Sequence, residues 1–113
     1  VVSQNKQLCT PASADSIVSS NGQEDHVSMG ANAATKLQKV VDNLKTVLAI
    51  ELMTASQAFY FRKEKTSDEL SAMLKAFREK VPFIDEDRIL HHDIQAARSF
   101  IEEFEVEAEQ IYA

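Results

Sequence analysis

A run of polar residues at positions 23–30 holds the side chains of this 113-residue sequence that are best suited to chemistry. The run reads Gln23-Glu24-Asp25-His26-Val27-Ser28-Met29-Gly30. It lies where an irregular segment meets the expected start of a long helix, whose free backbone N–H groups can hold an anionic side chain. A carboxylate held there can take a proton, or orient an ammonium or imidazole through a charged hydrogen bond. Glu24 is therefore the leading candidate for a catalytic and substrate-binding residue.

Simpler structural roles compete with chemistry for the charged residues of this run. Glu24 and Asp25 would also be favoured by the positive end of the helix dipole, whatever the function of the protein. Acidic residues before helices are common, so the residue types alone favour the structural role. A lone histidine near a helix start more often satisfies local structure than acts in catalysis, and we expect His26 to position the motif.

Metal binding and nucleophilic catalysis have weaker support in the sequence. The run His91-His92-Asp93 contains residue types that bind metals, but adjacent side chains diverge and no third ligand has a suitable spacing. We therefore predict a helix start there and no metal site. Cys9 has no neighbouring histidine to activate it, which makes it a weak candidate nucleophile.

The composition argues against several classes of function. A net charge of −6 is unsuited to nucleic acid, because phosphate binding needs a basic face. We expect no membrane association, since Glu51 interrupts the best apolar run, residues 47–50. A single Cys9 and the lack of a signal-peptide pattern indicate a cytoplasmic protein. With only 2 Gly and 2 Pro there is little material for strand turns, which favours an all-α fold.

The apolar pattern predicts one long central helix from about residue 28 to residue 62. Its main stripe recurs every three or four residues, at Ala33, Leu37, Val40, Leu44, Leu48, Leu52, Ala55 and Phe59. Its second half is apolar on other faces too, so it should be buried nearly all round. Such a helix spans about 50 Å, which the rest of the chain cannot cover. We therefore expect it to belong to a larger helical bundle, covered by further sequence or by partner subunits.

Two shorter helices should follow, and an irregular segment should precede. Residues 1–25 show no sustained period and are expected to form a loop that carries the start of the polar motif, with residues 26–113 helical. Thr66 and Glu69 have capping-box spacing and predict the start of the second helix, which Pro82 ends. Asp93 is the expected N-cap of the last helix. Its apolar seam comprises Ile94, Ala97, Ile101, Phe104, Ala108 and Ile111.

The chain resembles the histidine ammonia-lyases, of the aromatic amino acid ammonia-lyase family, over nearly its whole length. The run from Gln23 to Gly30 matches the family's Gln-Glu-Asp-His-Val-Ser-Met-Gly motif, although many members have Ala-Asn where this chain has Asn21-Gly22. Related phenylalanine and tyrosine lyases generally carry Gln in place of Glu24, so the resemblance points to histidine as the substrate. The further segments that resemble the family are residues 5–6, 11–17, 47–52, 81–83, 87–88 and 93–94.

The resemblance implies a mostly helical, cytoplasmic homotetramer that eliminates ammonia from L-histidine to give trans-urocanate. It places Gln23 and Glu24 near the substrate, with Glu24 acting as a base or orienting the imidazole. The family's electrophile is a methylidene-imidazolone formed autocatalytically from an Ala-Ser-Gly triad. This chain has no such triad, and its nearest run is Ala12-Ser13-Ala14. We therefore expect the group to come from residues outside this chain, and the chain alone to be inactive.

Two other functions stay open at this stage. The acidic balance, the long helix and the apolar seam would also suit a non-enzymatic helical assembly module. A related aromatic amino acid lyase or an aminomutase with the same prosthetic group is the closer alternative. The chain begins Val1-Val2-Ser3 without Met, and we expect either a C-terminal piece of a larger enzyme or a processed N-terminus. In either case the exposed apolar helix should cause self-association.

Overall fold

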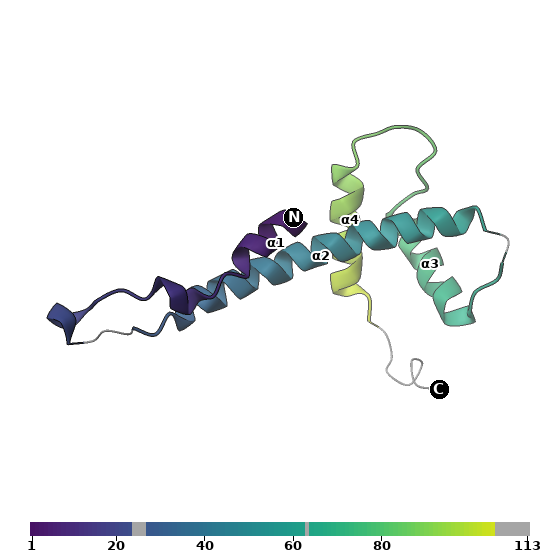
Figure 1. Cartoon of the computed structure of the whole chain (residues 1–113). Coiled ribbons are helices and arrows are strands. Elements are labelled where there is room, and N and C mark those ends of the chain that lie inside the picture. Colours follow the sequence, from purple (N-terminus) through teal and green to yellow (C-terminus); the bar gives the residue numbers. More distant parts are fainter. Residues whose placement is uncertain (24–26, 63, 106–113) are drawn as a thin grey trace. The chain divides into compact units, whose positions relative to one another are not determined.

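The computed structural model describes residues 1–23, 27–62 and 64–105 and shows an arrangement of helices (Figure 1). The elements are α1 (Val2–Leu8), η1 (Ala12–Asp15), η2 (Ser20–Gly22), α2 (Gly30–Tyr60), α3 (Asp68–Lys80) and α4 (His91–Glu103), where η denotes a short 3-10 helix. The all-α prediction is confirmed. The chain divides into two compact units, Val1–Leu44 and Lys45–Ala113. Within the described residues, none of the helices has the length and apolar character needed to cross a membrane.

The long central helix is confirmed with ends close to those predicted. Helix α2 has 31 residues and starts two residues later and ends two residues earlier than expected. Its apolar surface is only partly covered within this chain, because Ala49, Met53 and Ser56 are its buried residues. The large hydrophobic side chains of α2 that stay exposed are Leu37, Val41, Leu44, Leu48, Ile50, Phe59 and Tyr60. The sequence had indicated that this chain is too small to cover the helix.

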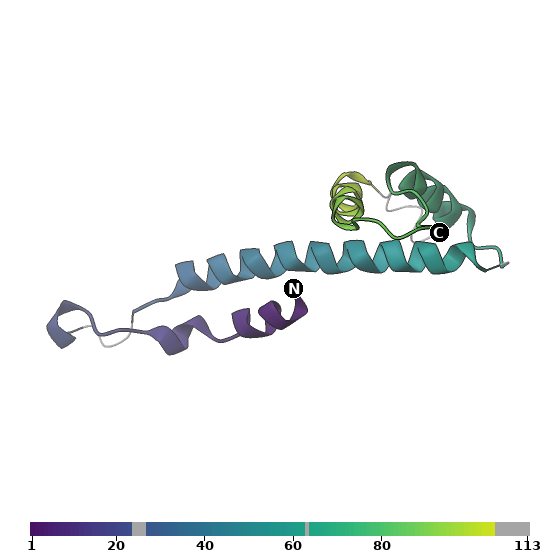
Figure 2. The same ribbon diagram turned by 90° about the horizontal axis from the view of Figure 1, so that it is seen from above.

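The N-terminal segment is more ordered than the sequence predicted. Residues 1–25 were expected to be irregular, but the structure contains α1 and two 3-10 turns there. An isolated helix of seven residues is unstable in water, so α1 depends on contacts from elsewhere in its unit. The Asn43 side-chain amide donates to Gln4 Oε1 at 2.9 Å and to Asn5 Oδ1 at 2.7 Å. Figures 1 and 2 show α1 and η1 running alongside the first part of α2.

The second unit has its core where α3 and α4 pack against the last part of α2. The buried apolar residues of this core are Ala49, Met53, Phe77, Val81, Ala97 and Phe100. The rings of Phe77 and Phe100 meet edge to face with centroids 5.2 Å apart, an arrangement that aromatic pairs favour. At the edge of the unit, Lys45 Nζ lies 2.8 Å from a carboxylate oxygen of Glu102. This hydrogen bond and the positive charge of Lys45 lower the pKa of Glu102.

Helix α3 begins one residue later than a cap at Thr66 would require. Ser67 is the N-cap, and its hydroxyl accepts from the backbone N–H of Leu70 at 3.3 Å. Hydrogen bonds to its own backbone N–H and to Ser67 lower the pKa of Glu69, in the first turn. The predicted end is confirmed, because α3 stops at Lys80 and Val81 adopts the extended backbone that a residue before proline favours.

Helix α4 begins earlier and ends sooner than predicted. Its first residue is His91, so Asp93 lies in the first turn and is not the N-cap. The reason is a competing partner, since the Asp93 carboxylate accepts from the Arg88 guanidinium at 3.0 and 2.8 Å. Phe104 has extended backbone angles and ends the helix, so among the described residues of the predicted seam Ile94, Ala97 and Ile101 are helical and Phe104 is not. Its last two positions, Ala108 and Ile111, lie outside the described residues.

Replacing Phe77 by alanine should destabilise the chain by about 3–5 kcal/mol, because the substitution leaves a cavity against Phe100 in the core. The measurement is the urea-unfolding free energy of the chain. Ile89→Ala is the matched control, since Ile89 is 74% exposed and its loss should change stability by less than about 0.5 kcal/mol. Equal effects of the two substitutions would contradict the assigned core.

Candidate functional site

The structure describes the polar motif on both sides of its acidic centre, at Gln23 and again from Val27 to Gly30. Gln23 is exposed, and its backbone N–H donates to the Ser20 carbonyl at 3.1 Å. The side chain of Gln23 is therefore accessible, and its role near the substrate remains a prediction. Glu24 and His26 lie outside the described residues, so the catalytic role of the first and the positioning role of the second remain predictions.

A side-chain hydrogen bond joins the two ends of the segment that carries the motif. The Ser16 hydroxyl accepts from the backbone N–H of Val27 at 3.0 Å, across eleven positions of sequence, and both residues are half-buried. Directly after it, the Met29 carbonyl accepts from the Ala33 N–H at 3.0 Å, which begins the α2 hydrogen-bond ladder. Ser16 and Val27 therefore tie together the described residues on either side of the motif's acidic centre, and we call residues 16–23 and 27–29 the motif loop. Sequence reasoning missed Ser16, because a serine in an irregular segment carries no pattern of its own.

A strained turn lies immediately before the motif. Ser20, Asn21 and Gly22 have φ angles of 51°, 56° and 84°, all in the left-handed region. This conformation is open to glycine and tolerated by asparagine, but for serine it costs on the order of 1–2 kcal/mol. The sequence Asn21-Gly22, which departs from the Ala-Asn of many relatives, thus has the residue types that this turn needs. Backbone strain of this kind concentrates at functional sites, where surrounding contacts hold it in place.

Contacts from α2 fix the segment that leads to this loop. Lys36 Nζ donates to the Thr10 carbonyl at 3.0 Å and lies 3.9 Å from the Asp15 carboxylate. Ala12 of η1 is buried. The first part of α2 therefore holds η1, and η1 leads through Ser16 into the motif loop.

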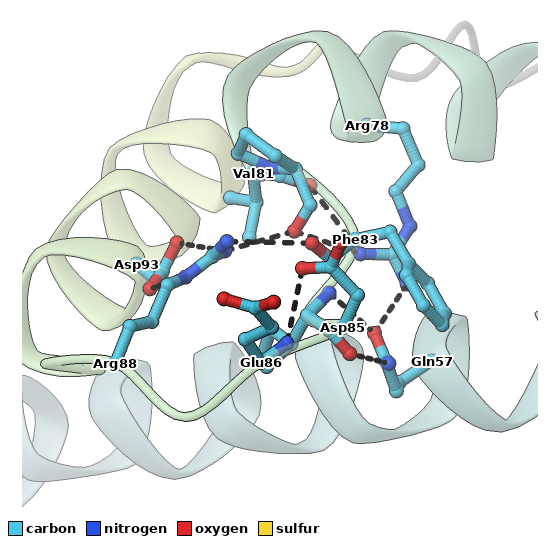
Figure 3. Close-up of polar contacts among 10 residues, drawn as sticks. Gln57, Arg78, Val81, Phe83, Asp85, Glu86, Arg88 and Asp93 are labelled. Carbon is cyan, nitrogen blue, oxygen red and sulfur yellow. Dashed lines mark hydrogen bonds and ion pairs between the residues drawn. The ribbon is translucent and has the colours of Figure 1, made fainter.

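A second cluster of polar side chains holds the loop between α3 and α4 (Figure 3). Gln57 binds the Ile84 backbone twice, because its amide nitrogen donates to the Ile84 carbonyl at 2.7 Å and its amide oxygen accepts from the Ile84 N–H at 3.2 Å. Arg78 donates to the carbonyls of Val81 and Pro82 at 3.3 and 3.4 Å. We call Gln57, Arg78, Arg88 and Asp93 the loop clamp.

Arg88 and Asp93 complete the loop clamp. The Arg88 guanidinium donates to the carbonyls of Pro82 and Phe83 at 3.1 and 3.3 Å, as well as to both carboxylate oxygens of Asp93. The hydrogen bond to Asp93 is the main reason that the pKa of Arg88 is raised. Burial, and then the charge of Arg88, lowers the pKa of Arg78. The side-chain donors of the loop clamp bind the loop backbone or another residue of the clamp. The clamp therefore holds the loop in place and has no donor left over for catalysis.

The histidine pair at the start of α4 does not form a metal site with its neighbours in the described residues. The rings of His91 and His92 have centroids 5.7 Å apart, and Asp93 is engaged by Arg88. Across residues 1–23, 27–62 and 64–105, no group of three or more His, Cys, Asp or Glu side chains is placed to hold a metal ion.

Substituting Ser16 by alanine should speed hydrogen exchange at the Val27 amide roughly fivefold, because the lost hydrogen bond is worth about 1 kcal/mol. Exchange rates measured by NMR test this expectation. Ser16→Thr keeps the hydroxyl and should preserve the protection, and Ser13→Ala in the adjacent η1 turn serves as the control. An unchanged Val27 rate in Ser16→Ala would show that the hydroxyl does not secure the loop.

Comparison with known proteins shows to which family this chain is similar. A family model described as aromatic amino acid lyase matches residues 1–79. The chain is 50% identical over 104 residues to a histidine ammonia-lyase of Anaeromyxobacter sp. strain K, covering 91% of this chain and 20% of that protein. It is 51% identical over 108 residues to a histidine ammonia-lyase of Caldanaerobacter subterraneus, covering 95% of this chain and 21% of that protein.

A solved structure agrees with the sequence relatives. The fold matches the crystal structure of histidine ammonia-lyase from Trypanosoma cruzi with a TM-score of 0.82 and 41% sequence identity, over 89% of this chain and 20% of that one. The chain thus spans about a fifth of the length of the relatives it matches. Since the family model covers more than half of these 113 residues, the chain belongs to the aromatic amino acid lyase family.

Proposed function

We propose that this chain is the C-terminal part of an enzyme that eliminates ammonia from L-histidine to give trans-urocanate. The observation that carries the proposal is the motif from Gln23 to Gly30, with Glu24 where related phenylalanine and tyrosine lyases generally have Gln. The similarity to proteins named histidine ammonia-lyase, at about half of all aligned positions, supports the same substrate. The exposed Gln23 and the attached ends of the motif loop suit a substrate-facing segment.

The reaction requires a base and a means of holding the imidazole. A proton leaves the β-carbon of histidine, and the electron pair of the broken C–H bond forms the new double bond between the α- and β-carbons. The amino group departs with the electrons of the broken C–N bond. Glu24 is assigned to this chemistry, either accepting the β-proton or binding the imidazole through a charged hydrogen bond. Gln23 is assigned to substrate binding, and His26 to positioning the motif.

The electrophile of the reaction does not come from the residues of this chain. Aromatic amino acid lyases use a methylidene-imidazolone group, whose formation requires an Ala-Ser-Gly triad. The nearest run here is Ala12-Ser13-Ala14, which lies in the η1 turn and has alanine where cyclisation needs glycine. These residues do not fit the group, so we assign it to another part of the full-length polypeptide.

The full-length enzyme is proposed to be a cytoplasmic homotetramer. The exposed apolar residues along α2 support burial of this helix by further protein. Association of the subunits would supply part of that cover.

Glu24→Gln in the full-length protein should reduce the rate of urocanate formation by about 10²–10⁴-fold, because an amide cannot accept a proton. Steady-state kinetics with L-histidine measure the effect. A base role predicts a fall in kcat with little change in KM, whereas imidazole binding predicts a rise in KM. Glu86→Gln makes the same change of charge in an exposed loop and should leave both constants unchanged.

A Glu24→Gln enzyme that keeps most of its histidine activity would sink the assignment of Glu24. Activity of the unmodified enzyme on L-phenylalanine or L-tyrosine in preference to L-histidine would instead favour a related lyase. Formation of a β-amino acid in place of ammonia and urocanate would favour an aminomutase.

The 113-residue chain alone should produce no urocanate, because the Ala-Ser-Gly triad that forms the electrophile is absent from it. The absorbance of urocanate after prolonged incubation of the purified chain with L-histidine is a direct test. The full-length enzyme at equal molar concentration provides the positive control. Measurable turnover by the chain alone would contradict the proposed source of the electrophile.

A further inference from the structure

Ser16 joins the two described stretches of the motif loop. Its hydroxyl accepts from the backbone N–H of Val27 at 3.0 Å, and both residues are half-buried. Val27 follows the acidic centre of the polar motif, whereas Ser16 lies outside the motif. The side chain of Ser16 therefore holds a backbone group of the motif from a separate stretch of the chain.

The position of Ser16 is itself set by α2, through the η1 turn. The backbone N–H of Ser16 donates to the Ser13 carbonyl at 3.4 Å, at the end of that turn. Lys36 of α2 holds the same turn, because its Nζ donates to the Thr10 carbonyl at 3.0 Å and lies 3.9 Å from the Asp15 carboxylate. The hydroxyl of Ser16 is thus an acceptor whose place is determined by the long helix.

The turn at residues 20–22 makes the motif loop sensitive to this hydrogen bond. Its φ angles of 51°, 56° and 84° are kept only where the surrounding structure holds them. The net contribution of one hydrogen bond is similar in size to the strain of one left-handed residue, so losing the bond can release the turn. Ile17 and Val18 are 67% and 71% exposed, so burial within the described residues adds little to hold this stretch.

We propose that Ser16 is a positioning residue for the elimination reaction and acts through the motif loop on Glu24. The inference rests on the proposed function, in which Glu24 accepts the β-proton or binds the imidazole. Ser16 contributes by placement alone, because its hydroxyl binds backbone. Misplacing a reacting group by about 1 Å can cost about 10²-fold in rate. Loss of the hydroxyl should therefore change the same kinetic constant that loss of the Glu24 carboxylate changes.

A double-mutant cycle in the full-length protein tests the proposal. Ser16→Ala, Glu24→Gln and the double variant are compared by steady-state kinetics with L-histidine, per mole of folded enzyme. Ser16→Ala alone should lower kcat/KM by about 10- to 100-fold, through kcat if Glu24 is the base and through KM if it binds the imidazole. In the Glu24→Gln background the same change should cost less than about twofold, because no carboxylate is left to position.

Two substitutions at position 16 separate the hydroxyl from the shape of the side chain. Ser16→Thr keeps the hydroxyl and should retain activity within about threefold, whereas Ser16→Val has the shape of threonine without the acceptor and should lose activity as Ser16→Ala does. This pair decides the question if Ser16→Ala fails to fold. Ser13→Ala removes an exposed hydroxyl from the neighbouring turn and should leave both constants unchanged.

Three outcomes would contradict these assignments, each in a different way. Equal losses from Ser16→Ala with and without the Glu24 carboxylate would show a merely structural role and overturn the Ser16 proposal alone. Equal activities of Ser16→Thr and Ser16→Val would also overturn it. An unimpaired Glu24→Gln enzyme would overturn both the role of Glu24 and that of Ser16. If the unmodified enzyme prefers another aromatic amino acid, the same cycle on that substrate still decides the role of Ser16, and only the proposed substrate is contradicted.

Discussion

The central constraint on this molecule is that α2 presents more apolar surface than its own chain covers. Three of its 31 residues are buried, all in the second unit, while leucine, isoleucine and phenylalanine side chains along its length remain exposed. A monomeric soluble domain avoids such an arrangement, because exposed apolar surface favours association. The relatives that this chain matches are about five times as long as the stretch that they share with it.

Where apolar packing is incomplete, a few polar side chains hold the connecting segments. Gln57 binds the Ile84 backbone as a neighbouring strand would, using its amide to satisfy both the N–H and the carbonyl. Arg88 is fixed by Asp93 and satisfies two further carbonyls of the same loop. In the first unit, Ser16 performs the simpler task of joining the two ends of the motif loop. Each of these side chains fixes loop backbone through hydrogen bonds, and in the second unit these bonds add to the packing of Ile84 against the core.

The sequence was most informative where a pattern extended over many residues. The spacing of apolar residues predicted α2 to within two residues at each end, and Pro82 marked the end of α3. Single caps were harder to place. Thr66 and Ser67 both carry hydroxyls that could cap the helix. Ser67 is the cap because its extended backbone directs its hydroxyl oxygen toward the N–H of Leu70. The sequence predicts Asp93 as a cap because no local pattern indicates that Arg88 binds its carboxylate.

Long-range contacts account for the features of the structure that the sequence did not predict. Helix α1 is too short to show a helical period, and it is supported by Asn43, about forty residues further along the chain. For the candidate site, the residue types and the family motif predicted Glu24, and the described residues add the geometry on either side of it. Ser16 and the left-handed turn could not be predicted, because both depend on backbone torsion and on a contact that no local pattern encodes.

The turn at Ser20, Asn21 and Gly22 has a consequence for how this protein can vary. Among the described residues, no atom beyond Gly22 and its two chain neighbours lies within 4 Å of the place that a Cβ would occupy, so these residues leave room for a side chain there. The positive φ angle nevertheless disfavours nearly every other amino acid. Substitution at this position is thus limited by backbone torsion rather than by neighbouring atoms, and even a small exposed side chain would strain the turn that leads to Gln23.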